Sequence, residues 1–265
     1  MKTDDHLLNK IKALKFYGLL AHWDEIRDAD WLEQIVAWEE IERAHRSLER
    51  RLANARIGDF KPLANFDWDW PKECDRGAIE DLMKLEFIKD STNVIFCGPN
   101  GVGKSTITRN ITHQAIHHGY TALFTSAGEM LNELAAQDGD NALRRRLKHY
   151  SQPDLLVIDE VGYLSYSNRH ADLLFEIVSR RYEKKPVIIT TNRPFGEWGD
   201  IFPNAASVVS LIDRLIHNSE ILSIDAESYR LKEAKENTQK RKEARNKRRK
   251  SKEKTSTSIN DNIES

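Results

Sequence analysis

The sequence predicts an α/β fold in which helices cover both faces of a parallel sheet, preceded by a small all-α domain. Three observations support this prediction. A glycine-rich stretch at residues 98–105 lies between an apolar run and a helical pattern. From Arg76 onward, short apolar runs alternate with helical patterns, as in sheets that are buried on both faces. Residues 1–60, in contrast, show helical periodicity and contain no catalytic motif.

The N-terminal domain, expected at residues 1–60, contains two helical patterns. Residues 6–23 carry leucine and isoleucine side chains at roughly helical spacing. Residues 31–55 form a longer pattern, in which Trp38 and Ile41 belong to the apolar face and arginines occupy much of the remainder. We therefore expect two helices in this domain.

A linker is expected to follow these helices. Gly58 and Pro62 end the second helical pattern, and the aromatic stretch Phe66–Pro71 comes next. This composition favours an extended chain that is anchored by its aromatic side chains. We expect residues 61–75 to be the linker and residues 76–230 to form the second domain.

The second domain alternates between helices and short apolar strands. Helices are expected at residues 78–87, 106–116, 128–137 and 171–183. Strands are expected at the apolar runs 93–97, 121–125, 155–158, 186–191 and 221–224. Continuous apolar strands that are separated by helices indicate a parallel sheet covered on both faces.

The charge of the chain is distributed unevenly. From Arg230 to Ser265 there are 13 Lys/Arg and 6 Asp/Glu, a balance of +7, whereas the rest of the chain carries −8. Residues 231–265 are expected to be a basic, disordered tail, because so polar a segment cannot bury a core. Such a tail indicates a nucleic-acid partner or a solvated end, and its composition does not distinguish the two.

Composition also excludes several classes of protein. No apolar run is long enough to cross a bilayer, and the first residues lack the apolar region of a signal peptide. The only cysteines, Cys74 and Cys97, suggest neither a disulfide framework nor a metal site. We expect a cytoplasmic protein without a membrane partner.

The glycine-rich stretch has the sequence of a phosphate-binding loop. It reads Gly-x4-Gly-Lys-Ser and stands between a strand and a helix, which is the setting that such a loop requires. Successive backbone N–H groups then surround a phosphate, and the helix N-terminus adds partial positive charge. Lys104 is expected to reach the β- and γ-phosphates, and Ser105 to offer its hydroxyl to Mg²⁺. The residues expected to bind the nucleotide are Gly98, Pro99, Asn100, Gly101, Val102, Gly103, Lys104, Ser105 and Thr106.

Two acidic residues follow the predicted strand at 155–158. An acidic side chain at the carboxyl end of a parallel strand faces the crevice in which ligands bind. We expect Asp159 to hold Mg²⁺, and Glu160 to orient or deprotonate the attacking water. A strand ending in two solvated acids is the alternative, and it fits less well with a phosphate-binding loop in the same chain.

Two further polar residues are candidates for catalysis. Asn192 ends the next strand, where its amide would lie beside the γ-phosphate and hold the attacking water; the alternative is a turn residue. Arg214 ends a helical segment and is expected to reach the nucleotide of a neighbouring subunit, where it would stabilise the transition state. The alternatives are an ion pair with Asp213 at the surface or a charge at the end of the helix.

Four of these features, in their order along the chain, resemble the motifs of AAA+ ATPases. Residues 98–105 match the Walker A motif, Asp159-Glu160 the Walker B motif, Asn192 the sensor 1 position and Arg214 the arginine finger. The resemblance covers about residues 78–230 and implies an AAA+ P-loop core that hydrolyses ATP with Mg²⁺. It also implies ATP sites between the subunits of a homo-oligomer.

Within this superfamily the chain is similar to the IstB/DnaC-like branch, whose members have no C-terminal lid. The similar segments are Thr125–Leu131, Pro153–Leu164, Thr190–Asn192, Asp213–Leu215 and Glu227–Arg230. The N-terminal region, with Trp31-Leu32, Glu39-Glu40 and its arginines, looks like that of IstB-type transposition helpers. The loop departs from the pattern only in ending Gly-Lys-Ser-Thr, and Ser105 can perform the same magnesium chemistry.

The resemblance also indicates where DNA would bind. A helix with Arg144, Arg145, Arg146 and Lys148 precedes the Walker B strand, at the place that faces the oligomer channel in the related initiator branch. Such a run fits phosphate contacts without base reading, and a solvated helix face is the alternative. Arginines of the N-terminal domain are further candidates: Arg43, Arg46 and Arg50.

The resemblance implies a transposition helper that assembles as an oligomer on duplex target DNA, deforms it, and recruits or stimulates a partner transposase. ATP hydrolysis would control disassembly, and the N-terminal domain would bind DNA or the partner and support self-assembly. A DnaC-type loader of a replicative helicase is the alternative. A small-molecule kinase is a third hypothesis, against which the acidic pair, the sensor Asn192 and the missing lid argue.

Overall fold

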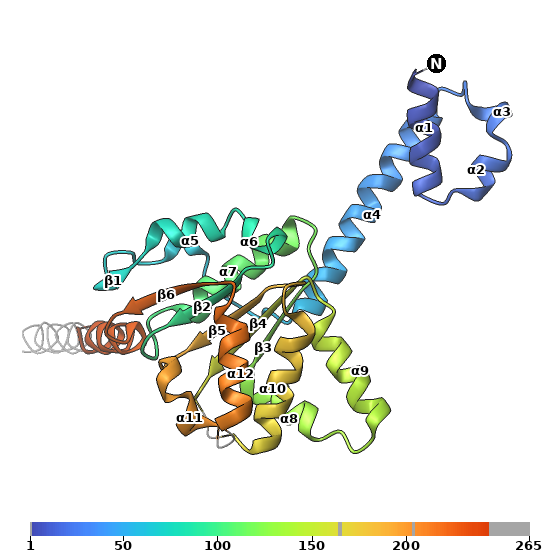
Figure 1. Cartoon of the computed structure of the whole chain (residues 1–265). Helices are drawn as coiled ribbons and strands as arrows, with labels where there is room; N and C mark the ends of the chain where they lie inside the picture. Colours follow the sequence, from blue (N-terminus) through green and yellow to red (C-terminus); the bar gives the residue numbers. More distant parts are fainter. Residues whose placement is uncertain (1, 164–165, 203–204, 244–265) are drawn as a thin grey trace, which may run out of the picture.

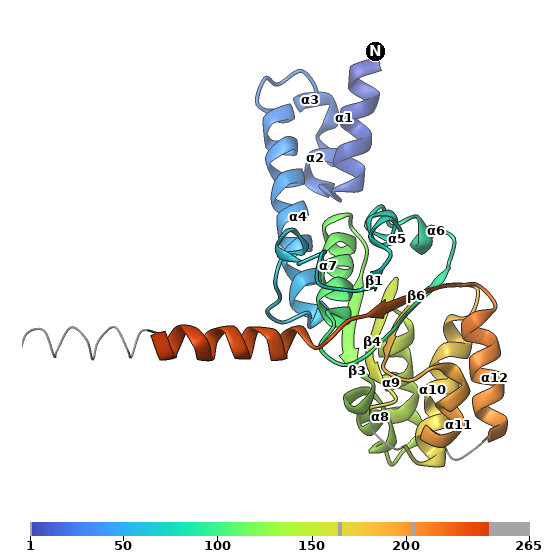
Figure 2. The same ribbon diagram turned by 90° about the vertical axis from the view of Figure 1, so that its left-hand side faces the viewer.

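The structure, a computed structural model, describes residues 2–163, 166–202 and 205–243. An α/β body carries a long helical arm at one side and a single projecting helix at another (Figures 1 and 2). The arm is the N-terminal domain, and the projecting helix comprises residues 229–243.

The N-terminal domain has four helices around a small core of its own. Its helices are α1 (Lys2–Ala13), α2 (Tyr17–Ala21), α3 (Trp23–Ile26) and α4 (Leu32–Ala55). Leu32 and Val36 of α4 pack against Ile11 and Leu14 at the end of α1. These side chains are spaced as the apolar faces of two amphipathic helices require.

The single helix predicted at residues 6–23 is wrong, because the chain turns after α1. Lys15 adopts a left-handed conformation with φ +56°, and the amide of Phe16 donates to the carbonyl of Ile11 at 3.1 Å. This is a Schellman ending, in which a residue with positive φ terminates a helix. The position is normally occupied by glycine, and Lys15 gives no such signal.

Helix α4 belongs to both parts of the molecule, and its bounds agree closely with the prediction of a helix at 31–55. Its last turns carry Leu48, Leu52 and Ala55 into a core that they share with α7 (Lys104–His117). The arm is thus continuous with the body through one rigid helix (Figure 1).

The body contains a six-stranded sheet in the order β1-β6-β2-β5-β4-β3. Its strands are β1 (Glu73–Cys74), β2 (Asn93–Cys97), β3 (Ala122–Ser126), β4 (Leu155–Val161), β5 (Val187–Thr191) and β6 (Ser219–Asp225). All pairings are parallel except that of β1 with β6. The five predicted strands and the parallel sheet are confirmed, and β1 was not predicted because a two-residue strand has no periodicity.

Helices cover both faces of this sheet, as predicted. Alternate side chains of β2 point to opposite faces of the sheet. Ile95 therefore packs in one core, and Val94 and Phe96 pack in the other. The Ile95 face is covered by α8 (Ala127–Ala135), α9 (Asp140–Ser151), α10 (Asn168–Arg181), α11 (Trp198–Ile201) and α12 (Ala205–Ile216). The opposite face is covered by α7, the end of α4, α5 (Arg76–Leu82) and α6 (Glu86–Lys89). Two short 3-10 helices, η1 (Leu63–Asn65) and η2 (Phe195–Glu197), complete the described elements.

The helix predicted at residues 78–87 is divided into α5 and α6. Leu85, with φ +65°, separates them. Its side chain is almost fully buried, so packing rather than local preference stabilises this turn.

The C-terminal segment begins as a helix, where disorder was expected from residue 231. Residues 229–243 are helical, and the remainder of that predicted tail lies outside the described residues. Lys232 pairs with Asp67 at 2.9 Å, and Glu233 pairs with Lys61. These contacts anchor the start of a segment rich in good helix formers. No helix within the described part of the chain is long and apolar enough to span a membrane.

Candidate nucleotide-binding site

The sheet order brings the predicted catalytic residues to one edge. Strand β5 lies between β2 and β4, so the carboxyl ends of three neighbouring parallel strands meet there. A cleft of about 790 Å³ opens at this edge, which is a common size for a small-ligand site. Its lining includes residues 100–106 of the predicted loop, Lys104 among them, together with Asp159, Glu160 and Asn192.

Glycine is required at two positions of the loop because other chain segments approach it closely. A Cβ atom at Gly98 would lie 2.1 Å from the carbonyl oxygen of Ile224 in β6. At Gly103, where φ is +102°, it would lie 2.5 Å from the ring of Phe66. Because these two positions carry no side chain, the loop can pack between strand β6 and the aromatic linker.

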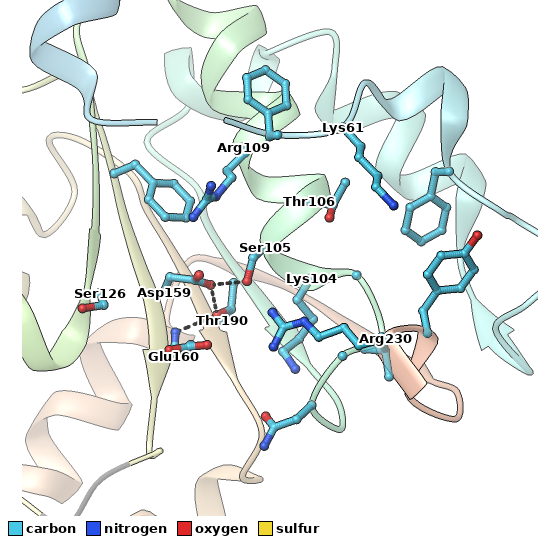
Figure 3. Close-up of a pocket in the computed structure, with 18 of the residues that line it drawn as sticks. Lys61, Lys104, Ser105, Thr106, Arg109, Ser126, Asp159, Glu160, Thr190 and Arg230 are labelled. Carbon is cyan, nitrogen blue, oxygen red and sulfur yellow. Dashed lines mark hydrogen bonds between the residues drawn. The ribbon is translucent and has the colours of Figure 1, made fainter. Parts of the chain in front are cut away.

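Lys104 is the first residue of α7 and points into the cleft (Figure 3). Its ammonium group donates to the carbonyl oxygens of Gly98 at 2.6 Å and Pro99 at 2.8 Å. Burial lowers the pKa of Lys104, and the nearby carboxylate of Asp159 acts in the opposite direction. The cation is thus held inside the loop, where a phosphate group would compete for it.

Asp159 is the centre of a hydrogen-bond chain across the strand ends (Figure 3). The hydroxyl of Ser105 donates to its Oδ1 at 3.1 Å, and that of Thr190 donates to the same atom at 2.5 Å. Thr190 also accepts from the backbone amide of Glu160 at 2.9 Å. One buried hydroxyl therefore joins both acidic residues, a positioning role that the sequence analysis missed.

The backbone of Glu160 is strained. Its φ is +62°, and the pairing of β4 with β5 shifts in register between Ile158 and Val161. Left-handed conformations cost a non-glycine residue about 1–3 kcal/mol and persist where the surroundings enforce them. This bulge turns the Glu160 side chain out of the sheet, to the cleft that it lines.

The cleft has polar atoms suited to a nucleotide and a metal ion. The Oδ1 atom of Asn192 is buried and has no hydrogen-bond partner within the described residues. Ser105 and Asp159 provide hydroxyl and carboxylate oxygens, the ligand types that Mg²⁺ prefers. In the described part of the chain, no group of three or more His, Cys, Asp or Glu could hold a metal. The residues therefore fit a magnesium ion that takes its other ligands from phosphate and water.

The opposite wall of the cleft comes from the linker and the C-terminal helix. Phe66, Trp70, Tyr229 and Arg230 line it. The Trp70 indole donates to the carbonyl of Glu227 at 2.9 Å, which ties the two segments together. In Figure 3, Arg230 extends into the cleft beside Lys104. No role was predicted for Arg230 from the sequence, because no local pattern indicates that these distant segments meet.

Arg214 does not line the cleft of its own chain. It lies on α12, donates to the hydroxyl of Ser179, and stacks on the ring of Phe175 at 4.5 Å. These contacts hold it on the surface formed by α10 and α12. Among the described residues, Arg214 forms no salt bridge with Asp213 and contacts Ser179 and Phe175 instead. It lies in the last turn of α12, as the alternative of a helix-end charge expects.

The basic residues predicted to contact DNA lie on two helices. On α9, Arg144, Arg145 and Lys148 are exposed, whereas Arg146 is half-buried and pairs with Glu133 at 2.7 Å. This helix stands at the outer edge of the body (Figure 1). Three of the four side chains are therefore presented to solvent.

On α4, the three arginines that were predicted to contact DNA are exposed. Arg43 pairs with Glu39 at 2.5 Å, and Arg46 pairs with Glu42 at 3.2 Å and with Glu39 at 3.5 Å. Within this helix, Arg50 is exposed as well. Exposed pairs of this kind are weak, so they leave the arginines available to other partners.

The family model and the relatives that match this sequence all describe ATP-binding proteins. A family described as IstB-like ATP binding protein matches residues 5–237. A Geobacillus stearothermophilus protein is 34% identical over 81% of this chain and 86% of its own length; it carries the name of an ATP-binding protein of insertion sequence IS5376. A Pseudomonas aeruginosa protein named for insertion sequence IS21 is 37% identical over 72% of both chains.

Solved structures share the fold at lower identity. The crystal structure of DnaI has a TM-score of 0.53 at 17% identity and covers 62% of this chain and 90% of its own. The AMPPCP-bound DnaA from Aquifex aeolicus has a TM-score of 0.51 at 22% identity, covering 68% and 55%. These neighbours agree with the predicted AAA+ core.

Proposed function

Because this chain belongs to the family of IstB-like ATP binding proteins and is an ATPase with an AAA+ fold, we propose that it is a transposition helper. In this proposal it assembles with ATP as an oligomer on duplex target DNA, deforms the DNA, and recruits or stimulates a partner transposase. Hydrolysis then controls disassembly. The observation that carries the proposal is the similarity, over most of the chain, to proteins named for insertion sequences.

In the proposed catalytic site, each group has a distinct task. Residues 98–106 surround the phosphates, and Lys104 leaves its loop carbonyls for the β- and γ-phosphates. Ser105 and Asp159 would hold Mg²⁺, which neutralises the charge that develops on the phosphate oxygens. Asn192 uses its free amide oxygen to orient the attacking water.

Hydrolysis itself is a displacement at the γ-phosphorus. The water oxygen bonds to that phosphorus while its proton passes to the carboxylate of Glu160. The bond from phosphorus to the β–γ bridging oxygen breaks, and ADP and phosphate are released. Thr190 supports this step by fixing the backbone of Glu160.

We propose that Arg214 completes the site of a neighbouring subunit. Its position away from its own cleft supports action in trans, because a surface arginine on α12 can enter the cleft of another copy. An arginine supplied in this way contributes roughly a thousandfold or more to the rate. ATP sites would therefore lie between subunits.

We further propose that duplex DNA contacts Arg144, Arg145 and Lys148 of α9, with help from the arginines of the N-terminal domain. The exposure of these side chains supports phosphate contacts, which carry little sequence information. Recognition would then depend on DNA deformability, so the sequence preference should be weak. ATP and chromosomal DNA are both cytoplasmic, and we expect the protein to act there.

A DnaC-type helicase loader is the second candidate, since DnaI shares the fold. The likeness at 17% identity concerns the fold alone. The two functions differ in their DNA: the transposition helper should assemble on duplexes, and the loader should prefer single strands and bind a replicative helicase.

The first experiment measures assembly on DNA. Electron microscopy and sedimentation with a 60-base-pair duplex and a slowly hydrolysed ATP analogue should show nucleotide-dependent oligomers. Lys104→Ala should abolish them, because the cation that binds the phosphates is lost. Oligomers of unchanged size in that variant would refute ATP-driven assembly.

The second experiment tests the shared site. Arg214→Ala and Glu160→Gln should each bind ATP and fail to hydrolyse it. Mixed in equal amounts, they should recover part of the activity, because some interfaces then pair an intact Glu160 with an intact Arg214. Mixtures without recovery would contradict action in trans.

A further inference from the structure

Asn110 is a buried polar residue of α7 whose side chain bonds to the linker. It is 9% exposed and lies within two turns of Lys104, the first residue of the helix. Its Oδ1 accepts from the amide of Leu63 at 2.9 Å, and its Nδ2 donates to the carbonyl oxygens of Lys61 at 2.9 Å and Thr106 at 2.8 Å. Figure 3 shows Lys61 of the linker beside Thr106 at the start of α7. The side-chain amide therefore fastens the linker to the helix that begins at the phosphate-binding loop.

These three bonds require the chemistry of an amide. A flipped amide would set its oxygen against two carbonyl oxygens and its NH₂ group against the N–H of Leu63. Aspartate could accept from Leu63 but could not donate to either carbonyl, and leucine could form none of the bonds. A buried polar group without a partner is costly, so substitution of Asn110 should release the linker from α7.

A short turn carries the effect of Asn110 to the phosphate-binding loop. Leu63 is the first residue of η1, and the amide of Phe66 donates to the carbonyl of Leu63 at 3.0 Å. The position of Leu63 therefore determines that of Phe66. The ring of Phe66 lies so close to Gly103 that a Cβ atom there would be 2.5 Å from it. A linker that is displaced at Leu63 would thus change the surroundings of the loop.

Other contacts of the linker are less suited to set its register. The pair Lys61–Glu233 is at the surface and the pair Lys232–Asp67 is partly exposed. Exposed pairs of this kind contribute little. Apolar side chains of the linker pack on the core, and such contacts are not directional. Asn110 provides bonds that are both buried and directional.

We propose that Asn110 is a positioning residue for nucleotide binding, which holds residues 61–66 against α7 so that they close one side of the phosphate-binding loop. The proposal rests on the proposed nucleotide site and requires neither DNA nor a transposase. Glu160 belongs to β4, and its backbone is held by Thr190 rather than by the linker. Loss of Asn110 should therefore weaken the binding of ATP and leave kcat almost unchanged.

The experiment measures binding and catalysis separately on the full chain. Isothermal titration with AMPPCP and Mg²⁺ gives the dissociation constant, and phosphate release at varied ATP gives KM and kcat. Asn110→Asp and Asn110→Leu should each raise the dissociation constant and KM about tenfold or more, because the linker loses buried bonds to α7. In both variants kcat should stay within about twofold of the natural value, since the catalytic groups keep their own bonds.

Thr112→Val is the matched control. Thr112 is fully buried on the same helix, and its hydroxyl donates to the carbonyl of Thr108 at 2.7 Å, so its bond stays within α7. This variant loses a buried hydrogen bond without touching the linker, and it should bind AMPPCP as the natural protein does. Asn110→Ser is a milder variant, because its hydroxyl can still donate to Thr106 while both linker bonds are lost. Circular dichroism should show the same helix content in all variants.

Hydrogen exchange supplies a local measurement that overall stability does not explain. The amide of Leu63 should exchange faster in the Asn110 variants than in the natural protein, whereas amides of β4 should keep their protection. An unchanged rate at Leu63 would overturn the proposal. So would a dissociation constant within twofold of the natural value while Leu63 exchanges faster, or a fall in kcat at unchanged affinity. Lys104→Ala should bind no AMPPCP; full binding by that variant would refute the nucleotide site itself, and the role of Asn110 with it.

Discussion

The hydroxyl of Thr190 joins the two acidic residues of the site, and its removal offers a strict test of the catalytic geometry. Thr190→Val keeps the shape of the side chain and deletes one donor and one acceptor. The donor bond to Asp159 is 2.5 Å long, and the acceptor bond from the amide of Glu160 is 2.9 Å long. Thr190 is fully buried, so water cannot replace either bond without opening the sheet.

The expected cost follows from these two bonds. Each buried polar group left without a partner costs about 1–3 kcal/mol, so we expect a loss of about 2–4 kcal/mol in the free energy of unfolding. The strained backbone of Glu160 also loses the amide contact that fixes it. A displacement of about 1 Å in a catalytic group lowers rates by up to a hundredfold. We therefore expect kcat to fall roughly 10–100-fold.

Two measurements check this expectation. Urea unfolding followed by circular dichroism gives the stability, and phosphate release at saturating ATP gives kcat. Thr190→Ser is the control, since it keeps both hydrogen bonds and loses a methyl group worth about 1 kcal/mol. A Val variant with kcat within twofold of the natural protein, or a Ser variant as slow as Val, would refute the role of the hydroxyl.

Three further predictions concern the loop, the core and pH. Gly103→Ala should weaken ATP binding about tenfold or more in isothermal titration, because the new Cβ would meet the ring of Phe66. Gly119→Ala is the control, since Gly119 has a similar positive φ but open space around it, and this variant should bind ATP normally. Arg181→Met should lower the free energy of unfolding by about 3–5 kcal/mol in urea, since the buried guanidinium donates to five backbone carbonyls; a loss under 1 kcal/mol would contradict this. Burial lowers the pKa of His113 below 6.5, so the folded state takes up a proton less readily and stability should fall as pH drops below 6.5. His113→Gln should reduce that dependence in thermal unfolding, and an unchanged dependence would exclude it as the source.

The elements that were predicted correctly are those whose periodicity agrees with their burial. Strand β2 has the predicted bounds, because all of Asn93–Phe96 is buried between two layers of helices. Two of the errors lie where non-glycine residues take positive φ. Lys15 ends α1 and Leu85 separates α5 from α6, and neither residue type signals a left-handed turn. Tertiary packing decided these positions, and a single sequence does not contain that information locally.

In the candidate site, too, some residues were predicted from the sequence and others depend on tertiary packing. The loop and the acidic pair were found because their residues are contiguous and their chemistry requires a fixed spacing. The links from Thr190 to Asp159 and from Arg230 to the cleft depend on strand order, which brings separate segments together. Only the order β2-β5-β4 reveals that a threonine of one strand binds the Asp159 carboxylate and the Glu160 backbone amide of the next.

The wall formed by the linker and the C-terminal helix has a consequence for how the protein is made. The pair Lys61–Glu233 joins residues 172 positions apart, and Lys232–Asp67 joins residues 165 apart. A ribosome delivers the linker early and its partner helix last, so this wall cannot close until nearly the whole described chain has been synthesised. Strand β6, which flanks the loop strand, is also among the final segments. A nascent chain therefore holds a complete phosphate-binding motif well before the wall that encloses the cleft can form.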